Sequence, residues 1–95
     1  MPGPPWTILE EREAAKILDK LPKQVAEKYE IWCAIVRQSG PHGLRLIKGF
    51  HDEKLGGKLK LLRSCRLNQQ WRVIYRIEAN IVTVYVERIT PHDYR

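Results

Sequence analysis

The chain has 95 residues, of which 43% are apolar, and it carries a formal net charge of +6. This length suits one domain with a modest core, which we place over residues 1–95. No apolar run reaches the roughly 20 residues of a membrane span, and the N-terminus lacks the pattern of a signal peptide, so we expect a soluble, cytoplasmic protein with no membrane partner.

The charge is concentrated toward the C-terminus. Residues 1–53 carry eight basic and eight acidic side chains, whereas residues 54–95 carry nine basic and three acidic ones. A polyanion is therefore the expected partner of the C-terminal part. Charge alone does not separate RNA, DNA, an acidic protein or a simply solvated basic surface.

The first expected elements are two helices. Thr7 and Glu10 form a capping-box pattern, and apolar side chains then recur at helical spacing, so we predict a helix over residues 8–21. Pro22 is typical of the first turn of a second helix, which Gly40 should end. A connection this short predicts an antiparallel helix hairpin. The apolar face of the second helix would consist of Val25, Tyr29, Trp32, Cys33 and Val36.

The pattern becomes strand-like after Lys60. Residues 44–47 are expected to form a short strand and residues 51–60 a flexible basic loop. Alternation of apolar and polar side chains then predicts strands at 61–67, 71–78 and 81–90. Ala79-Asn80 would form the turn between the last two, with Asn80 in the left-handed conformation.

These elements predict an α+β fold. The helix hairpin must cover one face of a twisted antiparallel sheet, because each layer alone leaves an apolar side exposed. The other face would carry Arg66, Arg72, Arg76 and Glu87. Cys33 and Cys65 stand apart in the sequence, which predicts two buried free thiols. The three histidines have no ligand spacing, so we expect no metal and no cofactor.

The C-terminal residues suggest phosphodiester chemistry. Cleaving RNA without a metal requires a base, an acid and cations that stabilise the phosphoryl oxygens. Arginine is a two-pronged phosphate partner, and Arg72 is the central candidate. Glu87 or His92 is the candidate base and His92 or Tyr94 the candidate acid, a choice that the sequence leaves open. The candidate RNA-binding cations are Lys54, Lys58, Lys60, Arg63, Arg66, Arg76 and Arg95.

A simpler interpretation exists for each of these residues. Any single arginine can be a solubilising charge on an exposed sheet face, and Glu87 can pair with an arginine across strands. From charge and periodicity alone, the chain is a basic α+β domain that could bind nucleic acid.

Three stretches together resemble the RelE/ParE superfamily of bacterial toxins, and most of all its HigB and RelE-like branch. They are residues 50–58, residues 63–78 with the run Trp71-Arg-Val-Ile-Tyr-Arg76, and residues 90–95 with His92-Asp-Tyr94. The resemblance implies two helices packed on a twisted antiparallel sheet that is usually preceded by a first strand. Only residues 1–6, with three prolines, remain for that strand here, so we expect it to be short or missing.

The resemblance also implies a function. Family members of this kind are toxins that cleave mRNA without a metal, often on the ribosome. An antitoxin neutralises the toxin. Arg72 matches the strand arginine that stabilises the transition state in the family. His92 and Tyr94 match the histidine and tyrosine positions near the C-terminus of some branches. Lys54, Lys58 and Lys60 match the basic loop loosely, and Glu87 has an approximate counterpart.

The implied partners are the ribosome, mRNA and an antitoxin. In the HigB branch the antitoxin is commonly a helix-turn-helix protein. The toxin would then contact operator DNA only through this antitoxin. Two alternatives stay open: a ParE-like inhibitor of DNA gyrase with the same fold, and a non-catalytic module that binds nucleic acid.

Overall fold

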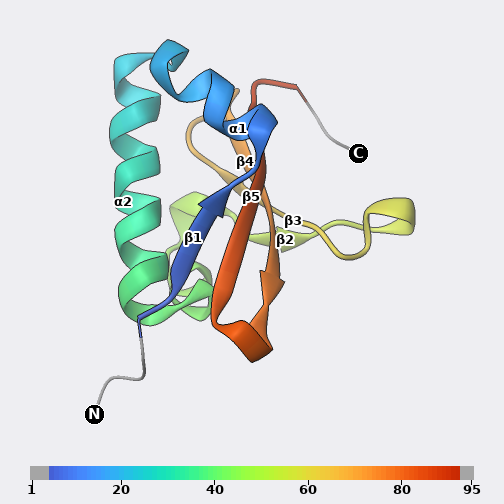
Figure 1. Cartoon of the computed structure of the whole chain (residues 1–95). Coiled ribbons are helices and arrows are strands. Elements are labelled where there is room, and N and C mark those ends of the chain that lie inside the picture. The colour runs from blue at the N-terminus through green and yellow to red at the C-terminus, as the bar shows by residue number, and fades with distance from the viewer. Residues whose placement is uncertain (1–4, 93–95) are drawn as a thin grey trace.

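The computed structural model describes residues 5–92 and contains a five-stranded sheet with helices packed against it (Figure 1). The strand order is β1-β5-β4-β3-β2. The α+β fold class is therefore confirmed. The strands are β1 (Thr7–Glu10), β2 (Glu53–Lys54), β3 (Arg63–Arg66), β4 (Arg72–Glu78) and β5 (Thr83–Thr90), and the α-helices are α1 (Arg12–Ile17) and α2 (Lys23–Ser39).

The N-terminal part differs from the predicted helix over residues 8–21. A first strand is present and short, but it occupies residues 7–10 and pairs in parallel with β5. The backbone N–H of Thr7 donates to the carbonyl of Val82 at 2.9 Å, and that of Glu11 donates to Val86 at 2.8 Å. This ladder along β5 replaces the local capping that the sequence suggested, because tertiary pairing overrides local preference.

The helix that follows is correspondingly short. It comprises α1, six residues long, and the 3₁₀ turn η1 (Leu18–Lys20). The chain therefore forms α1, η1 and the much longer α2 where the sequence predicted two long helices.

Helix α2 matches its prediction closely. Its buried residues are the five expected ones, Val25, Tyr29, Trp32, Cys33 and Val36. It starts directly after Pro22 and ends at Gly40, which has a φ of 74°. Because Pro41 lacks an N–H, the carbonyl of Arg37 cannot receive the usual helical bond. It accepts instead from the N–H of Trp6 at 3.0 Å, which joins the start of β1 to the end of α2.

The core lies between α2 and the sheet. Trp32 is fully buried, stacks on Tyr29 with ring centroids 5.7 Å apart, and meets the ring of Tyr75 edge-on at 5.3 Å. The alternation predicted for β4 and β5 is confirmed for Val73, Tyr75, Val84 and Val86, which all join this cluster. It fails at Val82, which lies outside β5, and Ile74 on the opposite face is also fully buried. Cys33 and Cys65 are buried free thiols, as predicted.

Several connections differ from the sequence-based prediction. Residues 44–47 belong mainly to a 3₁₀ segment, η2 (Pro41–Leu46), and not to a strand. The turn after β4 is η5 (Ala79–Ile81), and the left-handed residue there is Val82 with a φ of 50°, not Asn80. The expected loop over residues 51–60 contains β2 and η4 (Gly57–Leu59), and the segment between β2 and β3 projects from the body (Figure 1). Within residues 5–92, no helix is long and apolar enough to cross a membrane.

Candidate active site

Arg72 begins β4 on the sheet face turned away from the core. In the sheet register it lies opposite Arg66 of β3 on one side and opposite Thr90 of β5 on the other. Its side chain is half-buried, and its Nε is buried with no hydrogen-bond partner among residues 5–92. Buried polar atoms in proteins are normally bonded. An anion at this position would provide the acceptor that the described protein groups do not.

His92 lies at the same end of the β4–β5 pair. It follows Thr90, the register partner of Arg72, by two residues. Its backbone N–H donates to the Thr90 Oγ1 at 3.2 Å, and its residue is exposed to solvent. His92 and Thr90 also line a small cavity of about 220 Å³. The sheet register therefore places His92 at the same end of the β4–β5 pair as Arg72, but Arg72 does not line the cavity that His92 lines. Tyr94 and Arg95 lie outside the described residues.

Glu87 and Arg76 form an ion pair on the same face. The β4–β5 register shifts next to Ile74, which leaves Glu87 as the extra residue of a bulge. Its carboxylate accepts from the Arg76 Nε at 3.2 Å. Arg76 also contacts Glu78 at 2.8 Å and Glu11 at 3.8 Å. The charges of Glu87 and Arg76 are thus partly neutralised within the protein, which weakens both as candidates for contacts with RNA.

Arg63 has an internal partner that the sequence analysis did not identify. Its Nη2 and Nε donate to Asp52 Oδ2 at 2.6 Å and 3.2 Å. The other carboxylate oxygen accepts from the Tyr75 hydroxyl and, at 3.2 Å, from the Cys65 thiol. The side chain of Asp52 is fully buried, with Arg45 3.6 Å away. We assigned Arg63 to phosphate binding, but its guanidinium holds β3 against the segment before β2.

The ionisation of this cluster follows from its contacts. Burial by itself would raise the pKa of Asp52, but the hydrogen bonds from Arg63, Tyr75 and Cys65 outweigh it and hold that pKa below its usual value. Burial, together with the negative charge of Asp52, raises the pKa of both Tyr75 and Cys65. The cluster therefore contains an ionised carboxylate with neutral hydroxyl and thiol donors. A single aspartate between two basic stretches was the only sequence signal for it.

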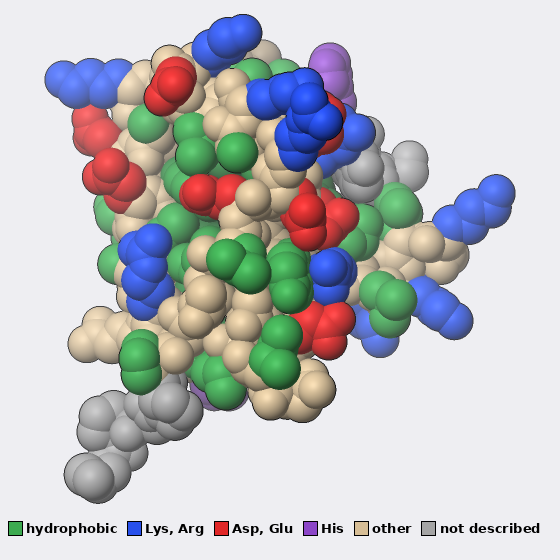
Figure 2. Space-filling model, in the orientation of Figure 1, with side chains coloured by type: hydrophobic (Ala, Val, Ile, Leu, Met, Phe, Trp, Pro, Cys, Tyr) green, Lys and Arg blue, Asp and Glu red, His purple; other side chains and the backbone are tan. Residues whose placement is uncertain are grey.

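The three lysines lie at the end of β2 and on the projecting segment that follows it. Lys54, Lys58 and Lys60 are all exposed. In Figure 2, basic side chains extend into solvent from this projection. Arg66 is also exposed, at the end of β3 beside Arg72. These four cations are free to contact a polyanion, unlike Arg63 and Arg76. Within residues 5–92, no group of His, Cys, Asp and Glu side chains could hold a metal ion.

Comparisons with known proteins identify the fold. No protein-family model matches the sequence, and no curated protein matches it. Among solved structures, a RelE–RelB complex from Pyrococcus horikoshii matches with a TM-score of 0.72 and 22% identity, over 95% of this chain and 98% of that one. A YoeB/ParE toxin from Agrobacterium tumefaciens matches with a TM-score of 0.73 and 13% identity, over 92% and 99%.

A third match is the RelBE2 toxin–antitoxin complex from Mycobacterium tuberculosis, with a TM-score of 0.60 and 22% identity, over 90% of this chain and 96% of that one. At these identities the matches establish the fold. They agree with the resemblance seen in the sequence, and the fold extends over nearly the whole chain.

Proposed function

We propose that this chain, which has the fold of RelE-type toxins, is the toxin of a toxin–antitoxin pair and an endonuclease that cleaves mRNA on the ribosome without a metal ion. The observation that carries the proposal is the half-buried guanidinium of Arg72, whose buried Nε has no acceptor among residues 5–92. His92 stands two residues beyond the register partner of Arg72. Lys54, Lys58 and Lys60 add exposed positive charge that suits RNA.

The proposed reaction uses the RNA's own 2′-hydroxyl as the nucleophile. A base removes its proton, the 2′-oxygen bonds to phosphorus, and the bond from phosphorus to the 5′-oxygen breaks as an acid protonates that oxygen. Arg72 would stabilise the negative charge that builds on the phosphoryl oxygens. His92 is our first choice for proton transfer, because imidazole exchanges protons near neutral pH. Glu87 would first have to leave Arg76, and Tyr94 remains the alternative acid.

The proposed partner is an antitoxin. Two of the structural matches are complexes of this kind, RelE–RelB and RelBE2. By the sequence resemblance, the antitoxin of this chain would be a helix-turn-helix protein, and operator DNA would be bound through it. Ribosome and mRNA would be the targets once the antitoxin is removed.

The test is primer extension on a reporter mRNA in a bacterial translation extract. We expect new 5′ ends inside the reading frame that require ribosomes. The Arg72→Ala variant should reduce cleavage by about 100-fold or more, the usual effect of removing one transition-state donor. Lys23→Ala removes an exposed positive charge at the start of α2 and should cleave like the wild type.

The alternatives give different results in matched assays. A gyrase inhibitor would block DNA supercoiling in a purified system without ribosomes. A non-catalytic module would bind RNA with a steep dependence on salt and leave it intact. Wild-type protein that produces no cuts on translating ribosomes would rule out the nuclease function.

A further inference from the structure

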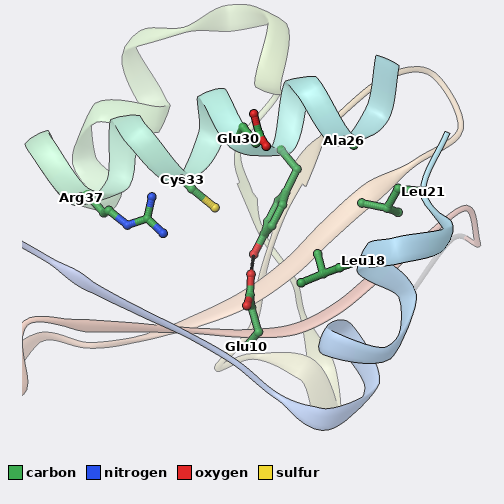
Figure 3. A pocket seen from close by; sticks show the side chains of 8 residues that line it. Glu10, Leu18, Leu21, Ala26, Glu30, Cys33 and Arg37 are labelled. Carbon is green, nitrogen blue, oxygen red and sulfur yellow. Dashed lines mark hydrogen bonds between the residues drawn. The ribbon is translucent and has the colours of Figure 1, made fainter. Parts of the chain in front are cut away.

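A second hollow lies between α2, β1 and η1 (Figure 3). Its volume is about 520 Å³, within the range of roughly 300–1,000 Å³ that is typical of binding sites. None of its lining residues belongs to the candidate active site. We call it the α2 groove and define it by Leu18, Leu21, Glu10 and one stripe of α2.

The stripe of α2 sets the length of the groove. Ala26, Tyr29, Glu30, Cys33 and Arg37 line it. The last four of these residues follow Ala26 by three, four, seven and eleven positions, which places all five on one face of the helix. With a rise of about 1.5 Å per residue, the stripe is roughly 16 Å long.

The two ends of the groove differ in polarity. The Tyr29 hydroxyl donates to the Glu10 carboxylate at 2.7 Å, a bond that crosses the groove. Figure 3 shows Leu18 and Leu21 on one side of Glu10 and Arg37 on the other. One end is therefore aliphatic and the other cationic.

The middle of the groove is acidic. Glu30 adds a second carboxylate to that of Glu10, so the wall holds two acids and one base in a chain whose net charge is +6. All three charges affect the thiol of Cys33. Burial raises the pKa of this thiol to about 11, Glu10 and Glu30 raise it further, and Arg37 lowers it. A basic group is the electrostatic match for the middle, and an acidic group is the match for the end at Arg37.

The edge of β1 borders the same groove. Thr7 and Glu11 donate their backbone N–H groups to β5, whereas Trp6 donates in the opposite direction, to α2. By this alternation, the backbone groups of Ile8 and Glu10 point away from β5. Within residues 5–92 these outward groups form no hydrogen bond to another backbone group. An open strand edge of this kind can pair with an extended chain.

We propose that the α2 groove binds an extended segment of a protein partner, about five residues long. A strand advances by about 3.3 Å per residue, so five residues span the roughly 16 Å of the groove. Alternate side chains face the same way, so the first, third and fifth residues point into the groove. From the Leu21 end to the Arg37 end, they are aliphatic, basic and acidic. This binding can be measured whether or not the chain cleaves RNA.

The test uses two fluorescent peptides and the full chain. One is acetyl-Leu-Ser-Lys-Ser-Glu-amide, and the other has the reversed sequence, because the direction of the segment is not fixed. Fluorescence anisotropy should give a Kd below about 1 mM for one of them. Glu30→Lys should weaken that binding at least about tenfold, which corresponds to 1.4 kcal/mol. A peptide with glutamate in place of the lysine should regain affinity for this variant.

Glu27→Lys is the matched control, since Glu27 is exposed on α2, does not line the groove and undergoes the same charge change. It should bind whichever of the two peptides the wild type binds, with the same affinity. Amide NMR shifts should locate the bound peptide at residues 26–37 of α2. The proposal is overturned if neither peptide binds at concentrations several-fold above about 1 mM. It is also overturned if Glu30→Lys and Glu27→Lys weaken binding equally, or if the NMR shifts occur outside residues 26–37.

Discussion

Replacing Asp52 by asparagine tests the buried cluster that joins β3 to the segment before β2. The substitution preserves shape but removes the charge that faces Arg63 at 2.6 Å. The side chain of Asp52 is 0% exposed and that of Arg63 only 18%, so water cannot replace the lost partner. The new amide would also direct N–H groups toward donors that now bond the carboxylate, namely Arg63, Tyr75 and Cys65.

The expected cost is large for a domain of this size. Breaking a buried ion pair by removing one partner costs about 3–5 kcal/mol. Taking about 3 kcal/mol and a urea m-value of about 1.5 kcal/mol/M, the unfolding midpoint should fall by about 2 M. The melting temperature should fall by about 12 °C or more. Glu27→Gln, a neutralised acid on the exposed side of α2, should leave both values unchanged.

The pH dependence gives an independent check. The pKa of Asp52 is lowered in the folded state, so its contribution to stability is present above the unfolded-state value of about 3.9 and is lost as the pH falls through the lowered pKa. The wild type should therefore lose stability on acidification by a component that Asp52→Asn lacks. A loss below about 1 kcal/mol at neutral pH would refute this account of the cluster.

Three further results are expected. Gly40→Ala should cost at least about 1–2 kcal/mol by urea unfolding, because φ is 74° and the new Cβ would lie 2.6 Å from the Trp6 Nε1; an unchanged midpoint would contradict this. Burial raises the pKa of the Cys33 thiol to about 11, so at pH 8 it should react with iodoacetamide at least about 100-fold more slowly than the cysteine of an unfolded peptide. The reaction should become faster as the pH rises, and mass spectrometry can follow it. His92→Gln should reduce mRNA cleavage by about 100-fold or more without changing the melting temperature, and equal cleavage would exclude its role in proton transfer.

Much of the fold could be read from spacing. The five buried residues of α2 follow directly from the apolar period of 3.6, and Gly40-Pro41 marks its end. The alternation in β4 and in the first half of β5 identified the core-facing side chains Val73, Tyr75, Val84 and Val86. These features are local, so the sequence is sufficient to predict them.

Residues 7–10 could not be assigned in the same way. The Thr7–Glu10 pattern fits a helix cap, but the chain forms β1 because β5 offers an unpaired edge there. That edge belongs to β5, which begins at Thr83, far along the chain, and pairs with β4 on its other side. Local propensity is a weak guide where a distant strand supplies hydrogen bonds.

The sequence by itself determined the basic character of the C-terminal part, the apolar stripe of α2 and the catalytic candidates Arg72, Glu87, His92 and Tyr94. Only the tertiary structure decided which arginines are free. It paired Arg63 with the buried Asp52 and Arg76 with Glu87, and it left the Arg72 Nε without an acceptor among residues 5–92. The reason is physical: whether a charge is neutralised depends on groups within a few ångströms, and strand register and chain crossing, not sequence spacing, bring those groups together.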